Sequence, residues 1–252
     1  MIIRRRTFLW LAVLAVVMSG SNAAAAAQTQ VAVAANFTEP AKEIATAFKA
    51  ATGHTALLTF GSSGEFYAQI AHGAPYEVFL SADAERPKRV EQEGLGVAGS
   101  RFTYALGRLA LYSRTPGLVD PAGAVLSGDR FEKLAIADPA AAPYGAAAVQ
   151  TMRKLGVYDR VRGKIVTGTS IGQTFQFVQT GAAELGFVAW SQVINAPGGS
   201  RWLVPAADHA PIDQQAILLQ AGAKSPAARA FLAFLKTPVA VAIIRRYGYE
   251  AP

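Results

Sequence analysis

The sequence predicts an α/β fold with mostly parallel strands, and two observations carry this prediction. Short runs rich in β-branched and aromatic residues alternate along the chain with segments whose apolar residues recur at helical spacing. Small or polar residues join strand to helix at four places, two in each half of the chain. The composition, 52% hydrophobic and 16% charged over 252 residues, excludes a disordered chain and allows one large domain or two smaller ones.

The first half of the chain is predicted to contain three strands, each followed by a helix. The strands span 31–35, 55–60 and 78–81. The helices span 38–51, about 64–72 and 84–93. The first helix has Pro40 near its first turn and Gly53 just beyond its end, where these residues are favoured at helix termini. The second helix carries Phe66 and Ile70 on one face, so it is expected to pack on the sheet.

The second half repeats this alternation and closes with two helices. The strands span 109–113, 134–137, 165–166, 185–190 and 215–219. The helices span 144–155, about 171–179, 226–235 and 239–246. Gly156 ends the first of these helices, because glycine is favoured just past a helix C-terminus.

The four strand-to-helix junctions are the candidate functional positions. They span 35–38, 61–64, 143–145 and 169–172. In open parallel sheets ligands bind at the carboxyl ends of the strands. The first N–H groups of each following helix lack partners there and carry the positive end of the helix dipole, so each junction is suited to an anion. In the second junction Ser62 and Ser63 can supply hydroxyl donors, although either serine could instead simply cap the helix.

The N-terminus has the three-part layout of a secretory signal. Arginines 4–6 precede an apolar run at 8–18, and the alanines at 23–27 provide a cleavage site, so residues 1–27 are predicted to be removed. The run is too short for a membrane span, which needs about 18 apolar residues. Residues 5–9, RRTFL, also resemble the twin-arginine export pattern, but Trp10 stands where a basic residue is common, so an ordinary secretion signal remains an alternative.

Charge and cysteine content narrow the class of protein further. Removal of the three N-terminal arginines lowers the formal charge from +7 to +4, and the longest basic runs in the remainder are the separate pairs Lys88-Arg89, Arg153-Lys154 and Arg245-Arg246. No basic stripe of the kind that binds nucleic acid is present, so no nucleic-acid partner is expected. The chain has no cysteine, which excludes disulfides and a lipid-anchored cysteine and predicts a protein free in the periplasm.

The sequence contains few candidate catalytic residues. The three histidines are His54, His72 and His209. None has metal-ligand spacing to another. The segment 61–64 is one residue short of the Gly-x-Ser-x-Gly nucleophile turn. A secreted serine hydrolase would therefore have to use Ser63 with His209 and Asp208 or Asp213, and this remains a minor alternative.

Seven segments carry a resemblance to a known family. In chain order they are VAVAANFTEPAKEIATAFKAATGH, FGSSGEFYAQIAHGAPYEVFLSADAE, GSRFTYALGRLALYS, DPAAAPYG, GTSIGQ, AELGFVAWSQV and KTPVAVAIIRRYGY. In order and spacing the chain resembles the periplasmic molybdate-binding proteins of molybdate ABC transporters over essentially all of its length after residue 27. The resemblance implies a two-lobed periplasmic binding protein fold with the ligand in the cleft between the lobes. It also implies a binding protein rather than an enzyme, without a cofactor, whose loaded form docks on a membrane permease.

The resemblance also implies the site residues. Asn36 stands at the family's first turn, Ser63 supplies the hydroxyl of the second, and Tyr144 and Ile171 offer backbone N–H groups. Molybdenum or tungsten would be held through the oxyanion oxygens and not by direct coordination. The possible additional donors are Ser62 and Ser170. Two positions depart from some members: Ala35 replaces a hydroxyl, and Ala189 replaces a ligand-binding tyrosine and is not included in the site.

A site of uncharged donors suits molybdate or tungstate, because these dianions are fully ionised at neutral pH and need no base. Sulfate has the same charge and shape, so a carrier of another small anion such as sulfate is the alternative within this class. The expected lobes are discontinuous: 28–108 with 219–252 form one, and 109–218 form the other. The protein is expected to be a monomer that closes about a hinge when the anion bridges the lobes.

Overall fold

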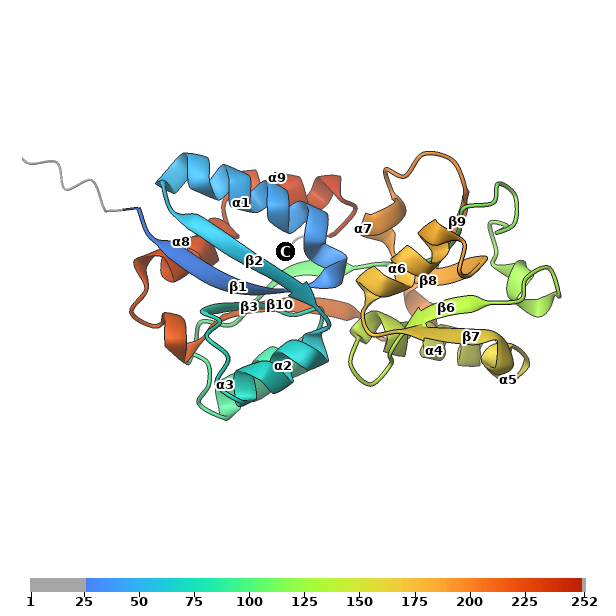
Figure 1. Ribbon diagram of the computed structural model, residues 1–252, viewed down its shortest axis with the longest axis horizontal. Coiled ribbons are helices and arrows are strands. Elements are labelled where there is room, and N and C mark those ends of the chain that lie inside the picture. Colours follow the sequence, from blue (N-terminus) through green and yellow to red (C-terminus); the bar gives the residue numbers. More distant parts are fainter. Residues whose placement is uncertain (1–25, 251–252) are drawn as a thin grey trace, which may run out of the picture.

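The computed structural model describes residues 26–250, so the predicted signal peptide lies outside the described residues except for its last two positions. The described chain forms two lobes side by side, each a five-stranded sheet with helices on both faces (Figure 1). This is the two-lobed α/β fold that the sequence predicts. Within residues 26–250 no single helix is long and apolar enough to cross a membrane, and only α8 (Pro226–Phe234) with α9 (Pro238–Arg246), bent by 59°, reach that length together.

The first lobe is built on a sheet with strand order β2-β1-β3-β10-β4. The strands are β1 (Gln28–Ala34), β2 (Thr55–Gly61), β3 (Val78–Leu80), β4 (Phe102–Gly107) and β10 (Ile212–Leu218). On one face lie α1 (Thr38–Thr52), α8 (Pro226–Phe234) and α9 (Pro238–Arg246). On the other face lie α2 (Ser63–Ala71) and α3 (Glu85–Gln92). Each face therefore has its own apolar core.

The second lobe is built on a sheet with strand order β7-β6-β8-β5-β9. The strands are β5 (Leu109–Ser113), β6 (Leu134–Ala137), β7 (Ile165–Gly168), β8 (Leu185–Ala189) and β9 (Ser200–Leu203). The helices α4 (Pro143–Lys154) and α5 (Tyr158–Val161) cover one face. The helices α6 (Ile171–Thr180) and α7 (Trp190–Val193) cover the other. The short 3-10 helices are η1 (Ala35–Phe37), η2 (Ala124–Ser127), η3 (Arg162–Lys164), η4 (Ala206–Asp208) and η5 (Gln220–Gly222).

Each sheet is mostly parallel, as expected, with one reversed strand that makes it mixed. In the first lobe β1 pairs in parallel with β2 and β3, whereas β10 runs antiparallel to β3 and β4. In the second lobe β6 pairs in parallel with β7 and β8, whereas β5 runs antiparallel to β8 and β9. The reversed strands, β10 and β5, lie where the chain passes between the lobes. Their neighbours β4 and β9 were not expected from the sequence.

The boundary between the lobes differs from the expected one on its return. The outward crossing lies between β4 and β5, where Arg108 alone separates the strands. The return crossing lies before Ile212 and not at 218 and 219, because β10 pairs along its length with β3 and β4. The sequence predicted only 215–219 as a strand, because Asp213 and Gln214 interrupt the apolar pattern, although Gln214 is buried.

Candidate functional site

The four predicted junctions face one another in pairs across the lobe boundary. The second turn of the first lobe approaches the loop before α4, where the Gly64 N–H donates to the Ala141 carbonyl over 2.9 Å. The first turn approaches α6, and a Cβ built on Gly172 would lie 3.3 Å from the Cβ of Ala35. Ser191 of α7 also donates to the Asn36 carbonyl over 3.0 Å. Each turn of the first lobe therefore meets the N-terminal end of a helix of the second lobe.

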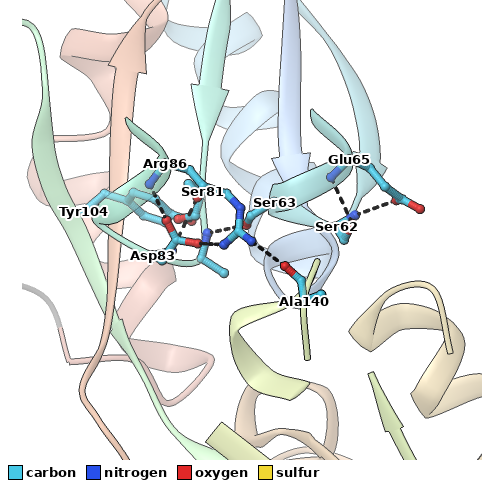
Figure 2. A network of polar contacts seen from close by, with 9 residues as sticks. Ser62, Ser63, Glu65, Ser81, Asp83, Arg86, Tyr104 and Ala140 are labelled. Carbon is cyan, nitrogen blue, oxygen red and sulfur yellow. Dashed lines mark hydrogen bonds and ion pairs between the residues drawn. The ribbon is translucent and has the colours of Figure 1, made fainter. Parts of the chain in front are cut away.

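Ser62 and Ser63 have different roles in the second turn. Ser62 caps α2: its hydroxyl accepts from the Glu65 N–H over 3.3 Å, and the Glu65 carboxylate accepts from the Ser62 N–H over 3.2 Å, which completes a capping box (Figure 2). The buried Ser63 hydroxyl accepts from the Ala82 N–H over 2.9 Å. Because that bond uses only an oxygen lone pair, the Ser63 hydroxyl hydrogen stays available for a ligand.

Asn36 occupies the first turn and is 2% exposed. Its Nδ2 donates to Oε1 of Gln214 over 2.7 Å and to the Tyr249 hydroxyl over 2.9 Å. Its carbonyl accepts from Tyr249 over 2.8 Å, in addition to the bond from Ser191. Among the described residues, Oδ1 of Asn36 is buried without a hydrogen-bond partner. The strand β10, the C-terminal segment and α7 thus fix the carboxamide and backbone of this residue.

Tyr144 and Ile171 stand at the N-termini of α4 and α6. Tyr144 follows Pro143, and Ile171 is the first residue of its helix, so neither N–H can reach a carbonyl four residues earlier within the helix. Ser170 caps α6, because its hydroxyl accepts from the Gln173 N–H over 3.3 Å. A Cβ on Gly145 would come within 2.1 Å of the Ala137 carbonyl, so this glycine lets α4 start against the end of β6.

The polar groups behind the site are uncharged. Burial raises the pKa of Tyr104 and Tyr144 well above the usual range and raises the pKa of Tyr249 to about 12. All three hydroxyls therefore stay protonated at neutral pH and can donate hydrogen bonds. At the rim of the lobe boundary, the Arg86 guanidinium forms an ion pair with Asp83 at 2.5 Å and donates to the Ala140 carbonyl of the second lobe over 2.8 Å (Figure 2).

The geometry gives little support to a catalytic or metal site. Ser63 bonds to the Ala82 N–H, while Nδ1 of His209 contacts the Ala210 carbonyl, so no hydrogen bond joins the two residues in the described chain. Nor do any three histidine, aspartate or glutamate side chains within residues 26–250 gather as metal ligands.

Comparison with known proteins identifies the family. A family model described as bacterial extracellular solute-binding protein matches residues 29–250. The chain belongs to this family. It is 58% identical over 236 residues to the molybdate-binding protein ModA of Rhodobacter capsulatus, which covers 94% of this chain and 93% of that protein. It is 54% identical to the molybdate-binding protein ModA of Azotobacter vinelandii, over 90% of this chain and 91% of the relative.

Two solved structures share the fold of this chain. A periplasmic molybdate-binding protein from Azotobacter vinelandii superimposes with a TM-score of 0.86 at 43% identity, covering 89% of this chain and 99% of that chain. The sulfate-binding protein SubI of Mycobacterium tuberculosis superimposes with a TM-score of 0.71 at 14% identity, covering 90% of this chain and 87% of that chain, which shows a shared fold alone.

Sequence reasoning missed several residues that surround the predicted site. They are Arg86, Tyr104, Ser191, Gln214 and Tyr249. A buried glutamine pair inside a strand was the one available signal, because buried polar side chains need hydrogen-bond partners. The other four residues lie at the site only because the two lobes pack together and the C-terminal segment folds back onto the first lobe.

Proposed function

We propose that this chain binds molybdate or tungstate in the periplasm and delivers it to the membrane permease of an ABC transporter. The observation that carries the proposal is the paired arrangement of two helix N-termini of one lobe with two turns of the other, at the boundary between the lobes. The relatives at 58% and 54% identity are named as molybdate-binding proteins, which supports this choice of anion.

The proposed ligand donors are Asn36, Ser63, Tyr144 and Ile171. Ser63 would donate through its free hydroxyl hydrogen, and Tyr144 and Ile171 through N–H groups that their helices leave unpaired. Ser62 and Ser170 both cap helices, so they would contribute through the helix termini that they stabilise. Each donor to a charged group contributes about 1.5–3 kcal/mol, and roughly six donors suffice for micromolar to nanomolar affinity after ordering costs.

Closure of the lobes would couple binding to delivery. The anion would contact both lobes only when they meet, so it favours the closed form by the difference in affinity between the two forms. The permease would recognise the closed monomer, and opening would release the anion. The chain would have no catalytic role, no cofactor and no nucleic-acid partner, and its N-terminal segment would export it by the general or the twin-arginine route.

Isothermal titration calorimetry of the purified mature protein tests this proposal with molybdate, tungstate and sulfate. Molybdate or tungstate should bind at micromolar affinity or tighter, and Ser63→Ala should weaken that binding about tenfold or more. The matched control is Thr46→Ala, which removes an exposed hydroxyl from α1 and should leave the affinity unchanged. Equal or stronger binding of sulfate would refute the choice of anion, and ester hydrolysis that disappears in Ser63→Ala would favour the hydrolase.

A further inference from the structure

The carboxamide nitrogen of Asn36 has hydrogen-bond partners in the described chain, whereas the carboxamide oxygen has none. Both hydrogens of Nδ2 are used, one by Oε1 of Gln214 at 2.7 Å and one by the Tyr249 hydroxyl at 2.9 Å. Its Oδ1, on the opposite side of the same carboxamide, is buried and has no partner in the described chain. A buried polar atom without a partner costs free energy, so this arrangement calls for a ligand or a different orientation.

An anion does not satisfy this oxygen. Oδ1 carries only lone pairs, and an oxyanion placed against it would meet an acceptor where it needs a donor. Asn36 lies on the turn that faces α6, where Ile171 offers an N–H group to the proposed ligand. The orientation that suits the anion is therefore the one in which Nδ2 takes the place of Oδ1.

A half-turn of two carboxamides together gives that orientation and satisfies their neighbours. The two ends of a carboxamide have nearly the same size, so exchanging them does not disturb the packing. After the exchange, Nε2 of Gln214 donates to Oδ1 of Asn36 and to the Tyr104 hydroxyl, which in turn donates to the Ser81 carbonyl. The single hydrogen of the Tyr249 hydroxyl then turns from the Asn36 carbonyl to Oδ1 of Asn36, and the carbonyl keeps the bond from Ser191.

The second lobe completes this network through Tyr144. Its hydroxyl lies 3.4 Å from Gln214, a long contact for an N–H donor. After the exchange the tyrosine donates to Oε1 of Gln214, which suits a hydroxyl held protonated by burial. Since Tyr144 lies in the first turn of α4 while Gln214 lies in β10, the contact that fixes the orientation of the glutamine forms between the lobes.

We propose that Gln214 is a positioning residue for the oxyanion: it donates to Oδ1 of Asn36 and thereby turns Nδ2 of Asn36 into the binding cleft. This inference rests on the proposed function and extends it. Tyr144 acts on Gln214 from the second lobe, so lobe closure and the orientation of the donor depend on each other. The side chains that face Gln214 come from η1, β4, α4 and the C-terminal segment, and their titratable groups are the hydroxyls of Tyr104, Tyr144 and Tyr249.

The test is Gln214→Glu, with tungstate as the titrant in calorimetry between pH 6 and pH 9. An ionised glutamate only accepts, so it would hold Nδ2 of Asn36 away from the cleft, whereas a protonated glutamate can donate. Affinity should fall at least 30-fold at pH 9 and recover at least tenfold at pH 6, while the unmodified protein changes less than threefold. The matched control is Gln215→Glu, because the Gln215 side chain contacts Arg101, Thr103 and Asp213 and none of the proposed donors. It adds the same charge and should follow the unmodified protein.

The outcomes separate this inference from the proposed function. If the unmodified protein binds neither tungstate nor molybdate, the proposed function fails. If it binds and Gln214→Glu either matches Gln215→Glu or loses affinity equally at both pH values, the positioning role is refuted. If Gln214→Glu does not fold, as judged by thermal unfolding, nitrogen-15 NMR of the unmodified protein decides: tungstate should shift the Asn36 side-chain amide signals strongly, and unshifted signals would overturn the proposal.

Discussion

Replacement of Gly64 by alanine should prevent full closure of the lobes. The added Cβ would lie 2.9 Å from both the Cα and the carbonyl oxygen of Ala141, about 0.5 Å less than the 3.4 Å at which ordinary contact begins. Relieving this overlap costs about 1–3 kcal/mol. Separation of the lobes would also break the 2.9 Å hydrogen bond from the Gly64 N–H to Ala141, which contributes about 1 kcal/mol.

The expected loss is therefore about 2–4 kcal/mol of closed-state free energy, which weakens tungstate binding roughly 30-fold or more. Calorimetry measures the affinity, and small-angle scattering measures closure. Thermal stability without ligand should not fall, since Gly64 lies in α2, where alanine is the better helix former. The control is Gly163→Ala, whose Cβ would meet nothing within 4 Å. If Gly64→Ala bound within threefold of the unmodified protein, contact between the Gly64 turn and Ala141 would not be part of the bound state.

Two further predictions concern the rim and the buried tyrosines. Arg86→Gln should weaken tungstate binding about three- to tenfold in calorimetry, because it removes the hydrogen bond to Ala140 of the second lobe. The control is Arg89→Gln, whose partner Glu93 lies in the same lobe and which should leave the affinity unchanged. Equal effects of the two substitutions would exclude a role for the bond between the lobes. Burial raises the pKa of Tyr249 to about 12, so the folded state keeps a proton that the unfolded state loses near pH 10. Thermal stability should therefore fall as the pH rises above 10. The fall should be less steep in Tyr249→Phe.

The fold class and most elements followed from the sequence because apolar periodicity and helix-terminal residues are local signals. Helix α1 begins at Thr38 and ends before Gly53, which has a φ of +74°, as its proline and glycine predicted. The strand β9 was not predicted, because its four residues, SRWL, include an exposed leucine and show no clear alternation of apolar and polar residues. The strand β10 was recognised only in part, because its buried glutamines look like surface residues in a pattern of apolarity.

The proposed site was predictable where it depends on local structure. Ser62 and Ser170 cap helices, as small polar residues before a helix indicate. The sequence could not show that Gln214 and Tyr249 meet Asn36, which lies 178 and 213 positions away along the chain. Those contacts exist because β10 and the C-terminal segment return to the first lobe, which is a property of topology and not of any local pattern.

The outward crossing between the lobes consists of Arg108 alone, and beside it Leu106 forms a bridge with Glu250 near the end of the chain. So short a connection leaves only a few backbone torsions free between two rigid sheets. Sliding of one lobe along the other would break the β4 and β5 ladders, while a swivel about this point keeps both intact. A transporter that separates the two lobes would therefore apply a torque. A small rotation at Arg108 would then produce a large separation of the lobes at the part of their boundary farthest from Arg108.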